Sequence, residues 1–397
     1  MTPEPVTHEI KCIYCGDAPV NHFAEYMGTI FAVHLEPITS KVTKHAPNFV
    51  KRLVDFMPNI VMPMLSFFRL ARTSNDVDKV ASFRSRIIWE EAVRRGIPME
   101  QLVIFGKPLE LYRARIPGQK FLEYFESIPV PPKYLDTGVL WDDKYTLKKV
   151  LSTHGIPVPK FVQHSPFTTK SLENIFETFE KPIIVKPRVG SRGRHTTTNI
   201  NTLAELKRAV KNAHTISPYV MIEEHLEGDI CRATLVGGKL AGFYRASAPA
   251  VVGDGQSTLS ELIEENNKTK PERVQPIEMT LEKMEYITRS GLTLQSVPKA
   301  GERIQLTHRI GRLFGGRTHE MIDELHPSFV PILEKAARTV GLAVLGFDVI
   351  VPDPTADQAT QKWGIIECNT LPFIDLHYYA LVGKPRNIAG MIWDLWK

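Results

Sequence analysis

The strongest constraint on the fold is a regular alternation of short apolar strands and amphipathic helices from residue 143 to the end of the chain. Elements that alternate in this way bury their apolar faces by packing helices onto sheets. The pattern therefore predicts an α/β (α+β) fold. The predicted strands cover residues 182–186, 219–223, 233–236, 240–244, 344–351 and 363–368.

The predicted helices carry start and stop signals. Thr202-x-x-Glu205 and Thr258-x-x-Glu261 are capping boxes, in which each side chain accepts a hydrogen bond from a backbone N–H at the helix start. Further helices are predicted at 143–155, at 327–340 with Pro327 in the first position and Gly341 as the stop, and at the C-terminus.

The first 135 residues follow a different pattern. A helix is predicted from Asp76, as N-cap, to Gly96, because apolar residues recur between them at helical spacing. The proline-rich stretch 128–132 is typical of a linker. A chain of 397 residues suggests two or three compact units at about 150 residues each. We therefore expect an N-terminal domain of unclear role at 1–135 and a second domain at 136–397.

Composition excludes several classes of protein. The content of hydrophobic residues, 43%, and of charged residues, 23%, is that of a globular chain rather than a disordered one. A net charge of +5 does not predict nucleic-acid binding, and four cysteines cannot form a disulfide framework. The most apolar stretch, 56–68, is too short and proline-broken for a membrane span. We expect a cytoplasmic protein with neither nucleic acid nor membrane as partner, and leave a homo-oligomer open.

A cation-rich loop follows the strand at 182–186. Its sequence runs from Lys186 to Arg194 and includes Gly190 and Gly193, which let backbone N–H groups approach a phosphate closely. The alternative is an exposed basic turn, and the loop alone does not decide between the two.

Two late strands carry polar residues within apolar runs. Asp348 interrupts residues 345–351, and Glu367 and Asn369 share one face of the next strand because side chains alternate. Their hard oxygen atoms suit Mg²⁺ held together with phosphates. Solvated carboxylates at strand ends are the alternative, but a carboxylate inside an apolar run is costly without a cation or donors. We favour the metal site.

These two sites, in this order, resemble the ATP-grasp ligases, and most of all the ATP-grasp module of cyanophycin synthetase. The resemblance covers residues 140 to 397 and implies an ATP-grasp fold of two α+β lobes that clamp ATP. The motifs that carry it are Asp143-Lys144, Lys186-Pro187 with its loop, residues 223–229, 236–240 and 251–255, Gly301-Glu302-Arg303, Gly315-Gly316, His326-Pro327, Glu367-x-Asn369 and residues 383–387.

The resemblance also implies roles for individual residues. The phosphates of ATP would be held by cations and by the glycine-containing loop, the adenine by a hinge stretch, and the ribose by an acidic residue. The cations are Lys144 and Lys186, and the loop residues are Gly190, Ser191, Arg192 and Gly193. The hinge residues are Glu223, Glu224 and Leu226, and the acidic residue is Asp229. Arg232 and Arg245 would face the γ-phosphate, and Asp348, Glu367 and Asn369 would bind Mg²⁺, with Mn²⁺ as an alternative.

The implied reaction is the ATP-dependent joining of a carboxylate to an amine. The carboxylate attacks the γ-phosphate and forms an acyl phosphate, and the amine then displaces phosphate to give an amide. The expected substrates are amino acids or short peptides. A ligase that acts on a protein or peptide terminus, and a silent nucleotide-binding scaffold, are the alternatives.

The sequence departs from the resemblance in three places. The loop before Gly315 contains Arg309 and Arg312 instead of asparagines, and these arginines could grip an acidic substrate or a phosphate. The segment 370–375 is more apolar, so the acceptor pocket is expected to differ. No P-loop follows, so we expect no Mur-ligase-like module.

Cys12-x-x-Cys15 is half of a typical zinc motif, and His8 and His22 lie nearby in the sequence. Because no second cysteine pair follows, free thiols are favoured over a structural Zn²⁺ site. Cys231 and Cys368 are expected to be core residues, and His195 and His377 to be surface or packing residues.

Overall fold

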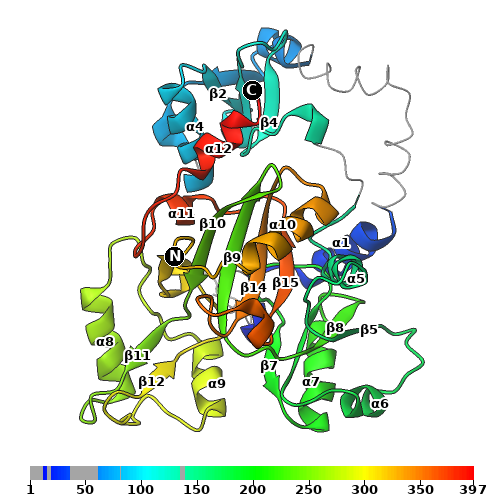
Figure 1. Ribbon diagram of the computed structural model, residues 1–397, viewed down its shortest axis with the longest axis vertical. Coiled ribbons are helices and arrows are strands. Elements are labelled where there is room, and N and C mark those ends of the chain that lie inside the picture. Colours follow the sequence, from blue (N-terminus) through cyan, green and yellow to red (C-terminus); the bar gives the residue numbers. More distant parts are fainter. Residues whose placement is uncertain (1–11, 16–18, 36–60, 81, 135–138) are drawn as a thin grey trace, which may run out of the picture. The chain divides into compact units, whose positions relative to one another are not determined.

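The computed structural model describes residues 12–15, 19–35, 61–80, 82–134 and 139–397, which form two compact units. Both units combine helices with antiparallel sheets, so the predicted α/β (α+β) class is confirmed (Figure 1). The boundary predicted after residue 135 falls within 135–138, outside the described residues. One unit contains Met1–Ala32, Pro159–His225 and Ala246–Arg317, and the other contains Val33–Val158, Leu226–Arg245 and Thr318–Lys397.

The second unit is built on a five-stranded sheet with the strand order β13-β10-β9-β14-β15. The predicted hairpin around Gly237-Gly238 joins β9 to β10, and the two late strands are confirmed as the antiparallel pair β14 and β15. The bounds are β9 Asp229–Val236, β10 Lys239–Ala246, β13 Thr318–Glu320, β14 Val344–Val351 and β15 Gly364–Asn369, with α5 Lys144–Thr153 and α10 Phe329–Val340.

Apolar residues of α10 and of the sheet form one buried core. Phe329 and Leu333 from α10 pack with Leu345 and Phe347 from β14, and all four are fully buried. The helix ends at Gly341 in a left-handed conformation (φ 79°), as predicted. The predicted start was too early, because Pro327 precedes the helix and Ser328 is its N-cap. The C-terminal end of α10 could therefore be predicted from Gly341, whereas the start of this helix could not be predicted from Pro327.

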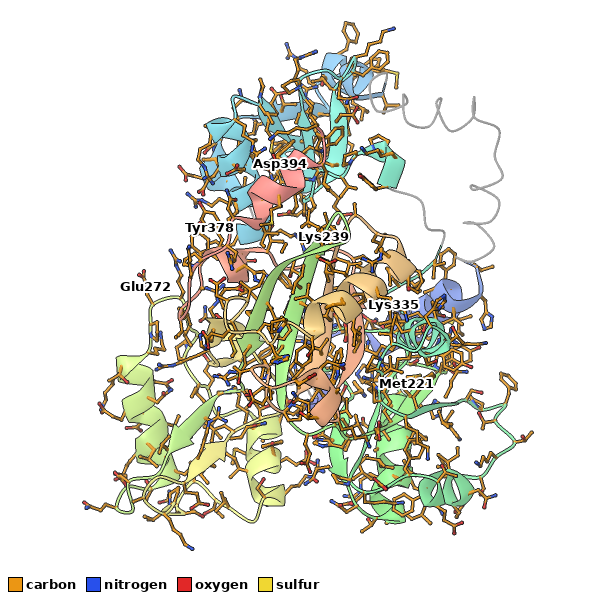
Figure 2. All side chains as sticks on the ribbon, in the orientation of Figure 1. Met221, Lys239, Glu272, Lys335, Tyr378 and Asp394 are labelled. Carbon is orange, nitrogen blue, oxygen red and sulfur yellow. The ribbon has the colours of Figure 1, made fainter. Side chains whose placement is uncertain are left out.

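A smaller sheet, β1-β2-β3-β4, packs in the same unit with α4 (Phe83–Arg94) and the C-terminal helix α12 (Ile388–Asp394). Figure 1 shows α12 beside α4, and Asp394, labelled in Figure 2, accepts a 2.8 Å hydrogen bond from Arg95. The strands are β1 Ala71–Ser74, β2 Met99–Ile104, β3 Lys107–Ala114 and β4 Glu123–Glu126; α11 spans Asp375–Tyr378, and the short helices are η2 Val77–Lys79, η3 Pro132–Tyr134 and η5 Gln358–Thr360.

Two predictions about this region need correction. The helix begins at Phe83 with Ser82 as N-cap, whereas Asp76 caps the separate short helix η2. The predicted start was too early because the apolar spacing continues back to Val80, which lies before Ser82. The proposed linker 128–132 is packed, since Ile128 is buried and the Pro129 carbonyl accepts a hydrogen bond from the Trp396 indole.

The first unit contains a four-stranded sheet, β5-β8-β6-β7, and a two-stranded sheet, β11-β12. Both predicted capping boxes are present and start helices α7 and α8. The strands are β5 Phe161–His164, β6 Ile183–Pro187, β7 Thr197–Ile200, β8 Val220–Glu224, β11 Ala250–Val252 and β12 Arg303–Gln305. The helices are α1 His22–His34, α6 Leu172–Glu177, α7 Leu203–Ala213, α8 Leu259–Thr269 and α9 Leu281–Arg289, with η1 Ile13–Cys15 and η4 Arg312–Phe314.

Among the described residues, no helix combines the length and the apolar character that crossing a membrane requires.

Trp393→Ala should strongly destabilise the second unit. Trp393 is 2% exposed, donates a 3.0 Å hydrogen bond to the Ile88 carbonyl and stacks edge-on against Phe125. Loss of a buried tryptophan costs about 3–5 kcal/mol, so the midpoint of urea unfolding should fall clearly. Met391→Ala on the same helix is the control, because Met391 is 42% exposed. Equal shifts in both variants would show that the packing of α12 is not what the structure describes.

Candidate active site

Three neighbouring strands of the second unit place charged residues in one row. The register pairs Asp348 on β14 with Arg232 on β9, and with Glu367 on β15. Residues directly opposite in antiparallel strands share a sheet face, so these three side chains lie on the same face. Cys368 is fully buried in the apolar core, as expected from its opposite orientation.

Arg232 and Asp348 form a buried bidentate ion pair. Arg232 Nε donates to Asp348 Oδ1 at 2.6 Å, and Nη2 donates to Oδ2 at 3.0 Å. Asn369 Nδ2 also donates to Oδ2, at 3.2 Å. Burial is the largest influence and acts to lower the pKa of Arg232, but Asp348, Tyr244 and Glu367 together outweigh it, and the net pKa is raised. The carboxylate within the apolar run of β14 is therefore met by a cation and an amide.

Gly346 and the Nη1 atom of Arg232 lie beside this ion pair. A Cβ atom at Gly346 would lie 2.9 Å from Arg232 Cδ, so only glycine leaves room for the arginine. Among the described residues, Arg232 Nη1 is buried and has no hydrogen-bond partner. A buried donor of this kind is costly unless a ligand or water accepts from it, so Nη1 is suited to an anionic oxygen.

Helix α5 positions a lysine beside Glu367. Asp143 caps the helix by accepting from the Tyr145 N–H at 3.0 Å, and Lys144 Nζ lies 3.7 Å from Glu367 Oε2. One turn later, the fully buried Lys148 donates to the Ile366 carbonyl at 2.6 Å. Lys148 was not predicted from the sequence, although its spacing of four residues from Lys144 places both on one helix face.

The residues of β14 and β15 fit a hard divalent cation. Asp348 and Glu367 bring carboxylate oxygens to opposite positions of the strand pair, and Asn369 lies next to Asp348. The side chains of Asp348 and Glu367 are 18% and 26% exposed, so both remain accessible from solvent. Oxygen ligands with partial access are typical of Mg²⁺ sites that also hold phosphates.

Asp229 and Arg245, predicted to bind ribose and phosphate, contact each other in the same unit. Their side chains lie 3.5 Å apart and are each about 40% exposed. An exposed pair of this kind is weak and can reorganise around a ligand. Leu226 belongs to this unit as well and is 4% exposed.

In the first unit, Lys186 on β6 forms an ion pair with Glu223 on β8. Lys186 Nζ lies 3.0 Å from Glu223 Oε2, and the residues are only 9% and 1% exposed. Lys186 is paired in register with Met221, which Figure 2 labels on β8. The neighbouring Glu224 side chain instead accepts from the Lys160 backbone N–H at 2.8 Å. Glu223 therefore meets a predicted phosphate-binding lysine.

The glycine-containing loop has the backbone that its sequence predicts. Gly190 and Gly193 have φ values of 134° and 65°, and Arg192, at 60°, is exposed. Gly193 lies against the imidazole of His308, since a Cβ there would be 3.5 Å from Nε2. Burial and the nearby Arg309 lower the pKa of His308 to about 4, so this ring is neutral at pH 7. The sequence analysis missed His308, for which no local signal exists.

Arg309, predicted to grip a substrate, is buried in the first unit. It donates to Glu282 Oε1 at 2.8 Å and lies over the ring of Phe314. Its neighbour Arg312 accepts a backbone hydrogen bond from Gln275. Arg309 is thus engaged with protein groups in this structure, and its part in substrate binding stays a prediction.

The two histidines named from the sequence are both buried. In the second unit, His377 lies between Glu320 and Thr234, and its ring excludes any side chain at Gly242. In the first unit, His195 lies directly after the loop, and Asn212 and Thr215 contact its Nδ1. The expectation of packing residues is confirmed for His377.

The predicted site residues thus form two groups, each within one unit. The group in the second unit consists of Lys144, Leu226, Asp229, Arg232, Arg245, Asp348, Glu367 and Asn369; the group in the first unit consists of Lys186, Gly190, Ser191, Arg192, Gly193, Glu223, Glu224 and Arg309.

Comparisons with known proteins find relatives for most of the chain. It is 30% identical over 264 residues to cyanophycin synthetase from Trichormus variabilis, which covers 64% of this chain and 29% of that protein. It is 30% identical over 321 residues to the glutathione biosynthesis bifunctional protein GshAB from Listeria innocua, which covers 78% of this chain and 40% of the relative. The chain therefore spans less than half the length of these relatives. No family model matches.

Among solved structures, the chain is similar to a bifunctional glutathione synthetase from Pasteurella multocida. The TM-score is 0.55 at 22% identity, and the match covers 81% of this chain and 44% of that one. At this identity the likeness establishes a shared fold and nothing about activity.

Gly346→Ala should disturb the pair of Arg232 and Asp348. The added methyl group would clash with Arg232 Cδ and with Pro372 Cβ, at 2.9 and 3.0 Å. Overpacking of this kind costs about 1–3 kcal/mol in the free energy of unfolding, measurable by urea titration. Gly28→Ala is the matched control, because a Cβ atom at Gly28 would have nothing within 4 Å and alanine favours the helix α1. A Gly346→Ala protein as stable as this control would contradict the described geometry.

Proposed function

We propose that this chain, a member of the ATP-grasp superfamily, is an ATP-dependent carboxylate–amine ligase. The observation that carries the proposal is the row of Arg232, Asp348 and Glu367 across β9, β14 and β15, with Lys144 beside it. Phosphoryl transfer needs positioned cations more than a covalent protein group, and this row combines cations with metal-ligating carboxylates. Similarity to enzymes of cyanophycin and glutathione synthesis supports the same activity.

Asp348, Glu367 and Asn369 are the residues that would hold Mg²⁺, or Mn²⁺ as the alternative. A bound divalent cation supplies charge neutralisation on the phosphate oxygens. Lys144 and Lys186 would bind the α- and β-phosphates, and Arg232 would donate from Nη1 to an oxygen of the γ-phosphate. The loop from Gly190 to Arg194 would cover the phosphates and exclude water, and Arg245 would assist beside Asp229.

In the proposed reaction a substrate carboxylate attacks the γ-phosphorus of ATP, and the bond to the β-phosphate oxygen breaks to release ADP. An amine then attacks the acyl carbon, and the C–O bond to phosphate breaks as the amide forms and the amine loses a proton. The guanidinium of Arg232, which its ion pair with Asp348 holds in one orientation, would stabilise developing negative charge in both steps. We infer that the substrates are amino acids or short peptides, because the relatives are named for the synthesis of cyanophycin and of glutathione.

The ligase module is proposed to be residues 136–397, with residues 1–135 as an N-terminal domain. We also propose that the protein works in the cytoplasm and leave homo-oligomerisation open. All four cysteines are free thiols, as a reducing compartment would maintain.

A phosphate-release screen tests the activity. The full chain is incubated with ATP, Mg²⁺ and pairs of amino acids or dipeptides, and ADP, phosphate and amide products are measured. Substrate-dependent ADP release with an amide product is expected. ATP binding without release under any substrate would favour a silent scaffold, and release only with a protein or peptide terminus would favour the second ligase alternative.

Glu367→Gln should lower turnover by at least about 100-fold. Changing a residue that only supports a metal ligand typically costs about 10–100-fold in metal affinity or activity, and Glu367 is proposed to be a ligand itself. The half-saturating Mg²⁺ concentration should rise, and the unfolding temperature should stay near that of the wild type, since glutamine has the same shape. Glu264→Gln, an exposed glutamate on α8, is the matched control and should behave as wild type. Unchanged Mg²⁺ dependence would remove Glu367 from the metal site.

Lys186→Met should weaken ATP binding by at least about tenfold, because a phosphate loses a charge-assisted contact worth about 1.5–3 kcal/mol. The affinity can be measured by titration calorimetry. Lys170→Met, an exposed lysine, is the control.

The same substitution leaves the buried Glu223 without its lysine, which is expected to lower stability. The double variant Lys186→Met/Glu223→Gln removes both charges and should recover stability but not affinity, and Glu223→Gln alone separates the contribution of that residue. Normal ATP affinity in the stable double variant would exclude Lys186 from the site.

A further inference from the structure

A cluster of cysteine and histidine side chains forms where the N-terminal segment meets the residue that follows the glycine-containing loop. Cys12, Cys15, His22 and His195 all belong to the first unit, and their ligand atoms lie within 4.8 Å of one another. Cys15 Sγ is 3.3 Å from His22 Nε2 and 3.5 Å from His195 Nε2, and Cys12 Sγ is 3.6 Å from His195 Nε2. Both cysteines are free thiols.

These separations match those of a tetrahedral zinc site. With Zn–S near 2.3 Å and Zn–N near 2.0–2.1 Å, a sulfur and a nitrogen ligand lie about 3.5 Å apart in a tetrahedron. Three of the four sulfur–nitrogen distances, at 3.3, 3.5 and 3.6 Å, surround this value. Two thiolates and two imidazoles form the Cys₂His₂ set that structural Zn²⁺ sites use.

The orientation of His195 is set by its second nitrogen. Nδ1 lies 2.9 Å from the Asn212 carbonyl oxygen, to which it donates when protonated, and 3.0 Å from Thr215 Oγ1. With its proton on Nδ1, the imidazole directs the lone pair of Nε2 toward the two sulfur atoms. Metal-ligating histidines are typically held in this way by a backbone carbonyl. The His195 backbone N–H also donates to the Tyr14 carbonyl at 2.9 Å, which aligns the ring with the Cys12–Cys15 turn.

Apolar packing does not account for the position of the N-terminal segment. Along α1, the large apolar residues Phe23, Met27 and Phe31 are 74%, 47% and 58% exposed, and Thr29 is the one buried residue of this helix. The cluster instead contains two fully buried residues, Cys15 and His195, at 0% and 1% exposure, whereas Cys12 and His22 are half-buried. A segment with little apolar burial needs another anchor, and a bound metal is a typical one.

We propose that Cys12, Cys15, His22 and His195 bind a structural Zn²⁺ ion that fastens the N-terminal segment to the end of the loop at 190–194. The sequence alone favoured free thiols because no second cysteine pair follows, whereas the structure supplies His195, which lies 183 residues after Cys12. His8, the ligand considered from the sequence, lies outside the described residues. The proposal does not depend on ligase activity, because it concerns metal content and loop order.

The test uses the full chain, purified under reducing conditions and loaded with Zn²⁺ or Co²⁺. We expect about one Zn²⁺ per chain by mass spectrometry, and a Co²⁺ spectrum with thiolate charge-transfer and tetrahedral d–d bands, as an S₂N₂ site requires. Wild-type protein that binds neither ion, or a Co²⁺ spectrum without thiolate bands, would overturn the proposal. This measurement needs no variant and so does not depend on whether variants fold.

Ligand variants then identify the residues. Cys12→Ser and His195→Ala should lose at least tenfold in Zn²⁺ affinity, whereas Cys12→His, which keeps four ligands, should retain Zn²⁺ with weaker thiolate bands. Cys231→Ala is the matched control, because this buried cysteine lies outside the cluster, and it should bind Zn²⁺ as the wild type does. Equal affinity in Cys12→Ser and Cys231→Ala would contradict the assignment.

Trypsin reports the effect on the loop without any nucleotide. Cleavage after Arg192 and Arg194 should be several-fold faster after Zn²⁺ is removed by a chelator and should slow again when Zn²⁺ is restored. Cleavage rates at these arginines that do not respond to Zn²⁺ would overturn the proposed fastening of the loop.

Discussion

The bidentate ion pair between Arg232 and Asp348 joins β9 to β14 in the five-stranded sheet of the second unit, and the candidate site in that unit is arranged around it. Removal of one partner from such a pair typically costs about 3–5 kcal/mol, because the other charge is left buried. The pair requires Gly346 beside it and recruits Asn369 from the next strand. Its two hydrogen bonds fix the guanidinium plane, so the remaining nitrogen, Nη1, points in one direction. A structural pair thereby presents a donor of fixed orientation.

The first unit also contains a buried ion pair between a cation and a carboxylate. Lys186 is held against Glu223 between two strands, and both are almost completely buried. In each unit a cation predicted to bind phosphate is therefore already matched by a carboxylate. Such a cation is positioned in advance, but a ligand must compete with its partner, which lowers the net gain from each contact.

Local sequence signals predicted most of the elements that position the site. Capping boxes, the hairpin glycines and the alternation along β14 and β15 depend on neighbours in the sequence, and the structure confirms them. The predicted start of α4 was wrong because apolar residues recur at helical spacing back to Val80, whereas the helix begins only at Phe83, after its N-cap Ser82. The partner of Asp348 was not predicted either, since strand register is decided by the whole sheet.

The cluster at Cys12 was also not predicted, because one of its ligands is distant in the sequence. The sequence near Cys12 contains one cysteine pair and two histidines but no second cysteine pair, which favours free thiols. Folding supplies His195 from the strand region after the loop, and Asn212 and Thr215 from the end of α7 orient it. None of these three has any sequence relation to Cys12. A metal site that joins an N-terminal segment to a distant loop must take ligands from both. The long sequence separation of these ligands prevents their prediction from a local motif, and the same separation would allow the metal to hold the two segments together.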